Sequence, residues 1–196
     1  MWNERYSADH YIYGTTPNDF LAAHYQRIPA KGRVLCLADG EGRNGVFLAR
    51  QGYAVTSVDL SEVGLEKARK LAQEHGVSLT LLHADLQHFS LGEAQWDGIV
   101  SIFCHLPSPA RLALYRQIPR SLTAAGVLLL EGYSPAQLAY NTGGPKDKDM
   151  LTSAALLRAE LPGLHFEQLL ELERRIVEGS HHTGVGAVVN AIATRA

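Results

Sequence analysis

Arg33-Val-Leu-Cys-Leu-Ala-Asp-Gly-Glu-Gly-Arg-Asn-Gly45 and Tyr53-Ala-Val-Thr-Ser-Val-Asp59 are the two stretches that decide the fold. The apolar residues that open each stretch have the length and composition of buried strands. Gly40 and Gly42 permit a sharp turn and a close approach of the backbone to a ligand, and a helix that follows them directs free N–H groups at the loop. Asp59 ends the second strand, where its carboxylate can accept hydrogen bonds from a ribose diol. The pattern predicts a strand, glycine loop, helix and strand that bind an adenosine-containing cofactor.

Length and composition are those of one globular domain. The chain has 196 residues, 46% of them hydrophobic and 19% charged, with a net charge of -2. This balance argues against nucleic acid or an anionic membrane as the main partner. Cys36 and Cys104 both lie in apolar, strand-like runs, and residues 1–6 are polar, without the apolar core that we would expect of a signal peptide. We expect a cytoplasmic monomer or weak homodimer that acts on a small molecule.

Strand-like runs alternate with helical patterns along the chain, which predicts a parallel sheet covered by helices on both faces. We expect strands over residues 33–38, 54–59, 78–83, 98–103 and 126–133, and helices over 43–51, 61–76 and 109–122, the last broken near Pro119. A mobile loop over 141–149 and a helix over 152–161 follow. Strands over 165–177 and 184–194 close the chain as an antiparallel hairpin.

The glycine loop alone does not identify the cofactor. Residues 40–45 spell Gly-x-Gly-x-x-Gly, which also fits a nicotinamide dinucleotide. Asp39 and Glu41 would repel a pyrophosphate, whereas a carboxylate there can bind the ammonium group of S-adenosylmethionine. Asp85 offers an acceptor for the adenine amino group, and we expect no second catalytic domain for a hydride acceptor. These features favour S-adenosylmethionine, with an NAD-dependent oxidoreductase and a non-catalytic S-adenosylmethionine-binding module as the alternatives.

Further segments carry a family resemblance over nearly the whole chain: residues 2–6, 13–18, 40–44, 58–61, 84–86, 143–145 and 178–184. The chain resembles the class I S-adenosylmethionine-dependent methyltransferases, and more closely their small bacterial branch of tellurite-resistance and thiopurine methyltransferase-like proteins. The resemblance implies an α/β, Rossmann-like fold with a seven-stranded, mostly parallel sheet in the order 3-2-1-4-5-7-6, strand 7 antiparallel and helices on both faces.

The chain length and the aromatic N-terminal segment lead us to expect a single domain of three parts. These are an aromatic N-terminal lid over residues 1–30, a cofactor-binding core over 31–133, and a C-terminal helix and hairpin over 134–196. Cys36 and Ala38 depart from the family, which usually has Asp and Gly there. We expect a neighbouring acid in the loop to replace the missing one.

The same resemblance assigns the cofactor site. It implies that Gly40 and Gly42 pass beneath the methionine moiety, that Asp59 holds the ribose hydroxyls and that Asp85 accepts from the adenine amino group. The full predicted set is Ala38, Asp39, Gly40, Glu41, Gly42, Asn44, Asp59, Leu60, Ser61, Ala84, Asp85, Leu86 and Phe103.

Methyl transfer from a sulfonium is an in-line displacement that needs alignment and exclusion of water more than acid–base chemistry. A soft acceptor such as a thiolate or chalcogenide requires no base, so the sequence does not fix a catalytic group. The candidates for catalysis are His105, His182 and Arg43, and those for the acceptor pocket are Tyr6, Tyr11, Tyr13, Tyr133 and His182. We expect no metal, because the histidines lack the spacing of a ligand set.

Overall fold

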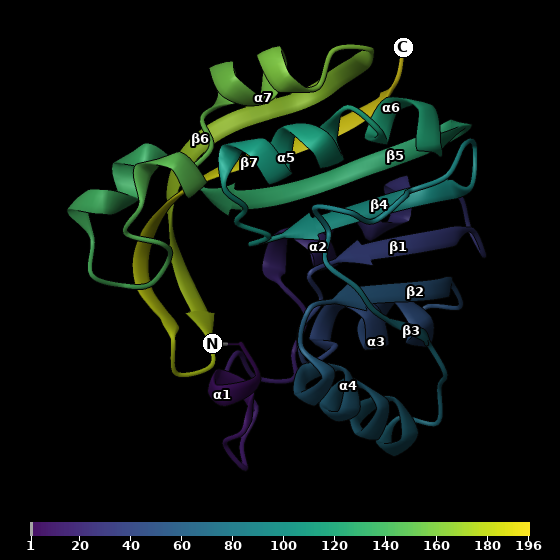
Figure 1. Ribbon diagram of the computed structural model, residues 1–196, viewed down its shortest axis with the longest axis vertical. Helices are drawn as coiled ribbons and strands as arrows, with labels where there is room; N and C mark the ends of the chain where they lie inside the picture. Colours follow the sequence, from purple (N-terminus) through teal and green to yellow (C-terminus); the bar gives the residue numbers. More distant parts are fainter. Residues whose placement is uncertain (1) are drawn as a thin grey trace.

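The computed structural model describes residues 2–196, and the part of the predicted lid that falls on residue 1 lies outside them. Its seven strands form one sheet in the order β3-β2-β1-β4-β5-β7-β6 (Figure 1). The strands are β1 (Arg33–Leu37), β2 (Ala54–Asp59), β3 (Thr80–His83), β4 (Trp96–Ile102), β5 (Leu122–Tyr133), β6 (Leu164–Glu178) and β7 (His182–Arg195). β7 pairs antiparallel with β5 and β6, and the other pairs are parallel. The predicted fold class and strand order are confirmed.

Helices cover both faces of this sheet (Figure 1). They are α1 (Trp2–Tyr6), α2 (Asp19–His24), α3 (Arg43–Arg50), α4 (Glu62–Glu74), α5 (Ser108–Tyr115), α6 (Ile118–Ser121) and α7 (Ala154–Glu160), with short 3₁₀ turns η1 (Tyr25–Arg27), η2 (Pro135–Ala139) and η3 (Lys148–Met150). α5, α6 and α7 pack on one face, and α2 and α3 pack on the other. No helix among residues 2–196 is long and apolar enough to cross a membrane.

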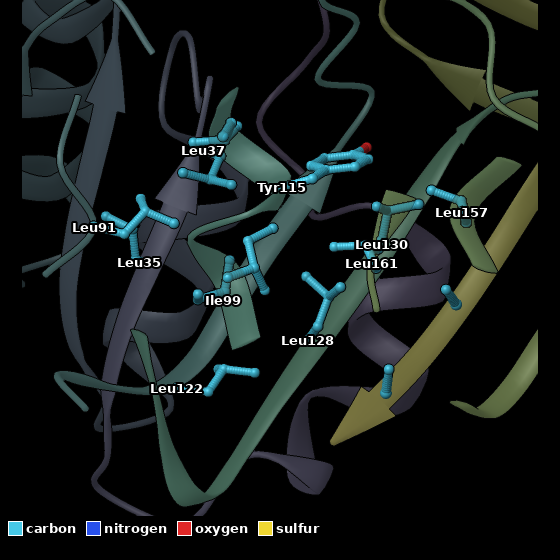
Figure 2. Close-up of a cluster of buried hydrophobic side chains, with 14 of the residues drawn as sticks. Leu35, Leu37, Leu91, Ile99, Tyr115, Leu122, Leu128, Leu130, Leu157 and Leu161 are labelled. Atoms are coloured by element: carbon cyan, nitrogen blue, oxygen red, sulfur yellow. The ribbon is translucent and has the colours of Figure 1, made fainter. Parts of the chain in front are cut away.

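The main core lies between the sheet and α5–α7. Figure 2 shows Leu35, Ile99 and Leu128 of three neighbouring strands meeting Tyr115 of α5 and Leu157 of α7. Burial of each such side chain contributes about 1.5–3 kcal/mol. Because the strands of this parallel sheet are covered on both sides, they read as continuous apolar runs rather than as alternating patterns.

Local signals account for most element boundaries. The Ser61 hydroxyl accepts from Gly64 N (3.1 Å) and begins α4, as expected from an N-cap. The predicted single helix over 109–122 is wrong beyond Tyr115: the chain forms α5 and the four-residue α6 instead, with Pro119 inside α6. Leu122 therefore belongs to β5, which begins four residues before the predicted 126.

The C-terminal hairpin reaches from the sheet to the N-terminal segment (Figure 1). Ser180 N at its tip donates to Ile12 O (2.9 Å), and the His182 and Tyr13 rings lie 4.6 Å apart. The loop predicted over 141–149 is attached to the same hairpin, because the Thr142 hydroxyl donates to Val185 O (2.7 Å). Three segments far apart in the sequence thus meet above one edge of the sheet.

Candidate active site

A cavity of about 460 Å³ lies at the carboxyl ends of the parallel strands, beside the point between the neighbouring strands β1 and β4 where the strand order reverses. Its walls come from the N-terminal segment, the glycine loop, the ends of β2 and β4, the loop before α7 and the hairpin tip. The lining residues include Trp2, Arg5, Tyr6, Tyr13, Ala38, Asp39, Glu41, Arg43, Asn44, Asp59, Leu60, Ala84, Asp85, Leu86, Phe103, His105, Met150 and His182. Most of the predicted site residues therefore meet around one space.

The glycine loop has the backbone that its sequence predicts, but for a reason the sequence does not show. Gly40 and Gly42 have φ values of 57° and 85°, in the left-handed region. A Cβ on Gly42 would lie 2.5 Å from Cβ of Ala68 in α4, and a Cβ on Gly40 would lie 2.6 Å from the Tyr6 hydroxyl. Glycine is therefore required at both positions by protein packing.

Asp59 connects the end of β2 to this loop. Its two carboxylate oxygens accept from Gly40 N and from Ser61 N, each at 2.8 Å. Burial raises the pKa of Asp59, and these backbone hydrogen bonds act in the opposite direction. A carboxylate has about four acceptor positions, so the group retains capacity for two further donors.

The two acids of the loop have different environments. Asp39 accepts from the Ser57 hydroxyl (2.6 Å) and from Gly45 N at the start of α3 (3.2 Å), and burial raises its pKa to about 7. Glu41 accepts from Ile12 N (2.8 Å) and pairs with Lys67 (2.7 Å). The Glu41 carboxylate thus joins the N-terminal segment to α4.

Leu60, Asp85 and Ser61 follow the ends of β2 and β3. Leu60 is 53% exposed, and it faces the cavity together with Asp85, whose carboxylate accepts from Gln87 N (2.9 Å). Ser61 does not line the cavity. Its hydroxyl caps α4 and donates to Asn3 Oδ1 (2.7 Å).

Aromatic side chains form the opposite end of the cavity. The Phe103 ring lies 4.6 Å from that of Tyr133 and 4.8 Å from that of His182. His105 Nδ1 lies 3.1 Å from Met150 O, and because a carbonyl only accepts, Nδ1 carries the proton. Burial lowers the pKa of His105 to about 4, so the ring is neutral near pH 7.

The predicted acceptor tyrosines separate into three positions. Tyr6 and Tyr13 line the cavity. Tyr11 lies in a different surface groove beside α4, where its hydroxyl donates to Lys67 O (3.2 Å). Tyr133 is fully buried behind Phe103, and its hydroxyl has no partner within the described chain.

A buried polar network attaches the N-terminal segment to the site. Asn18 Nδ2 donates to Glu131 (2.7 Å) and to Glu178 (2.8 Å). Arg43 Nη2 donates to Glu178 (2.7 Å), and Arg174 Nε donates to Glu131 (3.0 Å). Burial alone would raise the pKa of Glu178, but the neighbouring His182, Arg43 and Asn18 side chains lower it to about 2.

This network changes the interpretation of two predicted residues and adds others that sequence reasoning missed. The guanidinium of Arg43 is engaged by Glu178. His182 Nδ1 lies 3.7 Å from Glu178, too far for a hydrogen bond, and burial lowers its pKa. Glu131 gave one signal in the sequence, because it follows the apolar run Val127–Leu130. No group of three His, Cys, Asp or Glu residues suited to a metal ion occurs within residues 2–196.

Comparison with known proteins identifies the central part of the chain. Residues 34–126 match the model of the family described as "Methyltransferase domain". The uncharacterized methyltransferase YbaJ of Bacillus subtilis is 29% identical over 116 residues, which cover 58% of this chain and 46% of YbaJ. The tRNA 5-carboxymethoxyuridine methyltransferase of Escherichia coli is 30% identical over 149 residues, which cover 68% of this chain and 53% of that protein. The chain spans about half the length of these relatives.

The fold is also similar to that of a solved structure, TehB from Haemophilus influenzae. The TM-score is 0.73 at 18% identity, with coverage of 91% of this chain and 62% of that one. The family match over residues 34–126 covers the glycine loop and Asp59, the same segments that the sequence identifies as a cofactor site. With its domain match over residues 34–126, its methyltransferase relatives and its strand order, the chain is similar to the class I methyltransferases that use S-adenosylmethionine as their cofactor.

Proposed function

We propose that the protein transfers a methyl group from S-adenosylmethionine to a small-molecule acceptor. The observation that carries the proposal is a single cavity with two chemically distinct ends. One end holds the glycine loop and the Asp59 carboxylate, and the other is formed by Phe103, neutral His105 and Met150. When bound, S-adenosylmethionine supplies the activated methyl group.

At the polar end, each residue has a defined part in the proposal. Asp59 accepts from the two ribose hydroxyls with its remaining acceptor positions. Leu60 packs on the adenine ring, and Asp85 accepts from the adenine amino group. Asp39 binds the ammonium group, because it lines the cavity at the start of α3, whereas the carboxylate of Glu41 is already paired with Lys67.

The opposite end favours a small acceptor. Pockets of about 300–1,000 Å³ hold one drug-sized ligand, and this cavity of about 460 Å³ lies in the lower part of that range. S-adenosylmethionine would therefore fill most of it. A thiol or chalcogenide needs no base, which agrees with a wall that consists mainly of Phe103, Met150 and Pro145. His182 is the polar side chain we place beside the acceptor.

The N-terminal segment and the hairpin act together as the cover of this cavity in our proposal. Tyr6 and Tyr13 of the N-terminal segment and His182 of the hairpin line the cavity, and Glu178 of the hairpin is connected to the N-terminal segment through Asn18. Closure of such a cover excludes water and orients the acceptor behind the methyl group. Residues 1–30 then form the lid, 31–133 the cofactor core and 134–196 the acceptor side.

One relative is named for a tRNA substrate, but its length is only about half covered by this chain. The net charge of -2 favours a small molecule over an RNA. A non-catalytic cofactor-binding module is the competing function, and turnover distinguishes it from an enzyme.

The test is a direct assay of the purified protein. S-adenosylmethionine is incubated with a panel of thiol, selenide, halide and amine acceptors, and S-adenosylhomocysteine and the methylated product are measured by mass spectrometry. The Asp59→Ala variant is the matched control. We expect product with at least one soft acceptor, and much less product from the variant at the same subsaturating concentration of S-adenosylmethionine. Calorimetric binding of S-adenosylhomocysteine without turnover on any acceptor would instead support the non-catalytic module.

A further inference from the structure

Arg111 on α5 is a buried cation outside the cavity, and its donors reach both loops that form the acceptor end. It is 3% exposed. Its Nε and Nη2 donate to the two carboxylate oxygens of Glu160 on α7, at 2.7 and 3.0 Å. Its Nη1 donates to Leu106 O (3.2 Å) and Asp149 O (2.6 Å). The guanidinium thus joins two helices, which lie side by side in Figure 1, to two separate loops.

Those two loops carry cavity residues. Leu106 lines the cavity in the loop after β4, and Met150, the residue after Asp149, lines it from the turn before α7. The second loop is held from another side as well, because Asp149 Oδ2 accepts from Ser108 N at the start of α5 (2.7 Å). Arg111 therefore fixes the distance between two walls of the same space.

The contact extends one residue further, to His105. Met150 O accepts from His105 Nδ1 (3.1 Å), and His105 Nε2 is buried without a partner among the described residues. Met150 O selects the tautomer of His105, and Met150 directly follows Asp149, whose carbonyl accepts from Arg111. A shift of the 147–150 turn would break that hydrogen bond and release the ring.

Net stability is a poor explanation for this arrangement. Replacing a buried ion pair with apolar side chains of similar volume is often neutral or stabilising, because desolvation offsets the attraction between the charges. What apolar side chains cannot replace is the planar fork of donors, which binds a carboxylate and two carbonyls at once. The geometry points to a role in positioning.

We propose that Arg111, paired with Glu160, is a positioning residue that sets the shape of the acceptor end of the cavity and the tautomer of His105. The assignment of this end of the cavity to the methyl acceptor rests on the proposed function, but the positions of the two loops do not. The neutral state of His105 near pH 7, which follows from its lowered pKa, leaves the tautomer as the property that Met150 controls.

The test uses nitrogen-15-labelled histidine and NMR spectra that distinguish Nδ1–H from Nε2–H rings. His105 is assigned by the signal lost in His105→Gln. The main variant is Arg111→Met with Glu160→Met, which removes both charges and leaves no unpaired buried ion. Arg116→Met is the matched control, because Arg116 follows the same helix but is exposed. Amide exchange over residues 147–151 and calorimetric binding of S-adenosylhomocysteine are measured on all proteins.

We expect an Nδ1–H ring in the natural protein and the control, and a mixture of tautomers in the double variant. Exchange over 147–151 should be at least about tenfold faster, as the loss of one charge-assisted hydrogen bond would give. Affinity for S-adenosylhomocysteine should be unchanged. A folded double variant with the natural tautomer and natural exchange would overturn the proposal.

If the double variant does not fold, Arg111→Lys decides, because an ammonium lacks the fork and cannot bind Glu160 and both carbonyls together. Natural behaviour of Arg111→Lys would then overturn the proposal. Absence of S-adenosylhomocysteine binding to the natural protein would refute the proposed function and leave the positioning result interpretable.

Discussion

Removal of the Asp59 carboxylate tests the cofactor assignment most directly. We expect Asp59→Ala to lose two hydrogen bonds to the ribose hydroxyls, and bonds to a charged group contribute about 1.5–3 kcal/mol each. The sum of about 3–6 kcal/mol corresponds to a loss of affinity of more than a hundredfold, since about 1.4 kcal/mol is tenfold. Water entering the enlarged space recovers part of this, so tenfold is the lower limit of the prediction.

The structure adds a second consequence for the same variant. Asp59 also accepts from Gly40 N and Ser61 N, each at 2.8 Å, so the glycine loop and the start of α4 lose a common partner. Melting temperature should fall with the secondary structure retained.

The assay is calorimetric titration with S-adenosylhomocysteine, with circular dichroism as the check of folding. Asp85→Ala is the matched control, because this exposed acid offers fewer contacts and should weaken binding by less than Asp59→Ala. Unchanged affinity in a folded Asp59→Ala protein would refute the assignment of the ribose site.

The remaining predictions concern the loop, its acid and the cover. Gly42→Val should abolish S-adenosylhomocysteine binding more completely than Cys36→Ser. A Cβ at position 42 would lie 2.5 Å from Cβ of Ala68 on a backbone with φ of 85°, whereas Cys36 is buried inside β1. Equal losses of affinity in folded variants would contradict this order. Asp39 has a raised pKa of about 7, and the bound ammonium group favours its charged form. Affinity for S-adenosylhomocysteine should therefore be full above that pH and fall as the pH drops through it, and Asp39→Asn should remove the dependence. A flat calorimetric profile between pH 6 and pH 8, about one unit either side of this pKa, would exclude the role of Asp39. Saturating cofactor should slow amide exchange over residues 11–20 and 181–184, and exchange identical to that of the free protein in both segments would disprove the lid.

Elements that depend on neighbouring residues could be predicted from the sequence. Ser61 predicts the start of α4 because its hydroxyl accepts from the N–H of the residue three positions later. The glycine loop is recognisable because left-handed backbone at positions 40 and 42 favours glycine. The order of the sheet came from family resemblance, since apolar runs alone do not state which strands pair. The break between α5 and α6 was predicted near Pro119, but Pro119 lies inside α6 and the break comes before it. The start of β5 at Leu122 was missed because an apolar side chain suits a helix and a strand equally.

Long-range polar contacts could not be predicted, because their partners are far apart in the chain. Asn18 is 113 residues from Glu131 and 160 from Glu178, and no local pattern links them. The same limit applies to Glu41. Its negative charge beside the loop was noticed, but its partners, Ile12 N and Lys67, lie on other segments that the fold brings to it.

Buried charged side chains hold two groups of segments around the cavity, and one physical argument applies to both. In one group, Asn18 and Arg43 connect the N-terminal segment to Glu178 of the hairpin. In the other, Arg111 and Glu160 hold the loops of the acceptor end. Such pairs add little net stability, but removing one partner leaves an uncompensated buried charge and costs about 3–5 kcal/mol. A complete buried pair changes the free energy of folding little, whereas breaking the pair is strongly unfavourable. Such pairs therefore suit segments that must keep one geometry. The parallel sheet positions the cofactor loop through backbone hydrogen bonds. The N-terminal segment around Asn18 and the loops that contain Leu106 and Asp149 lie outside the sheet, and these buried polar and charged side chains position them instead.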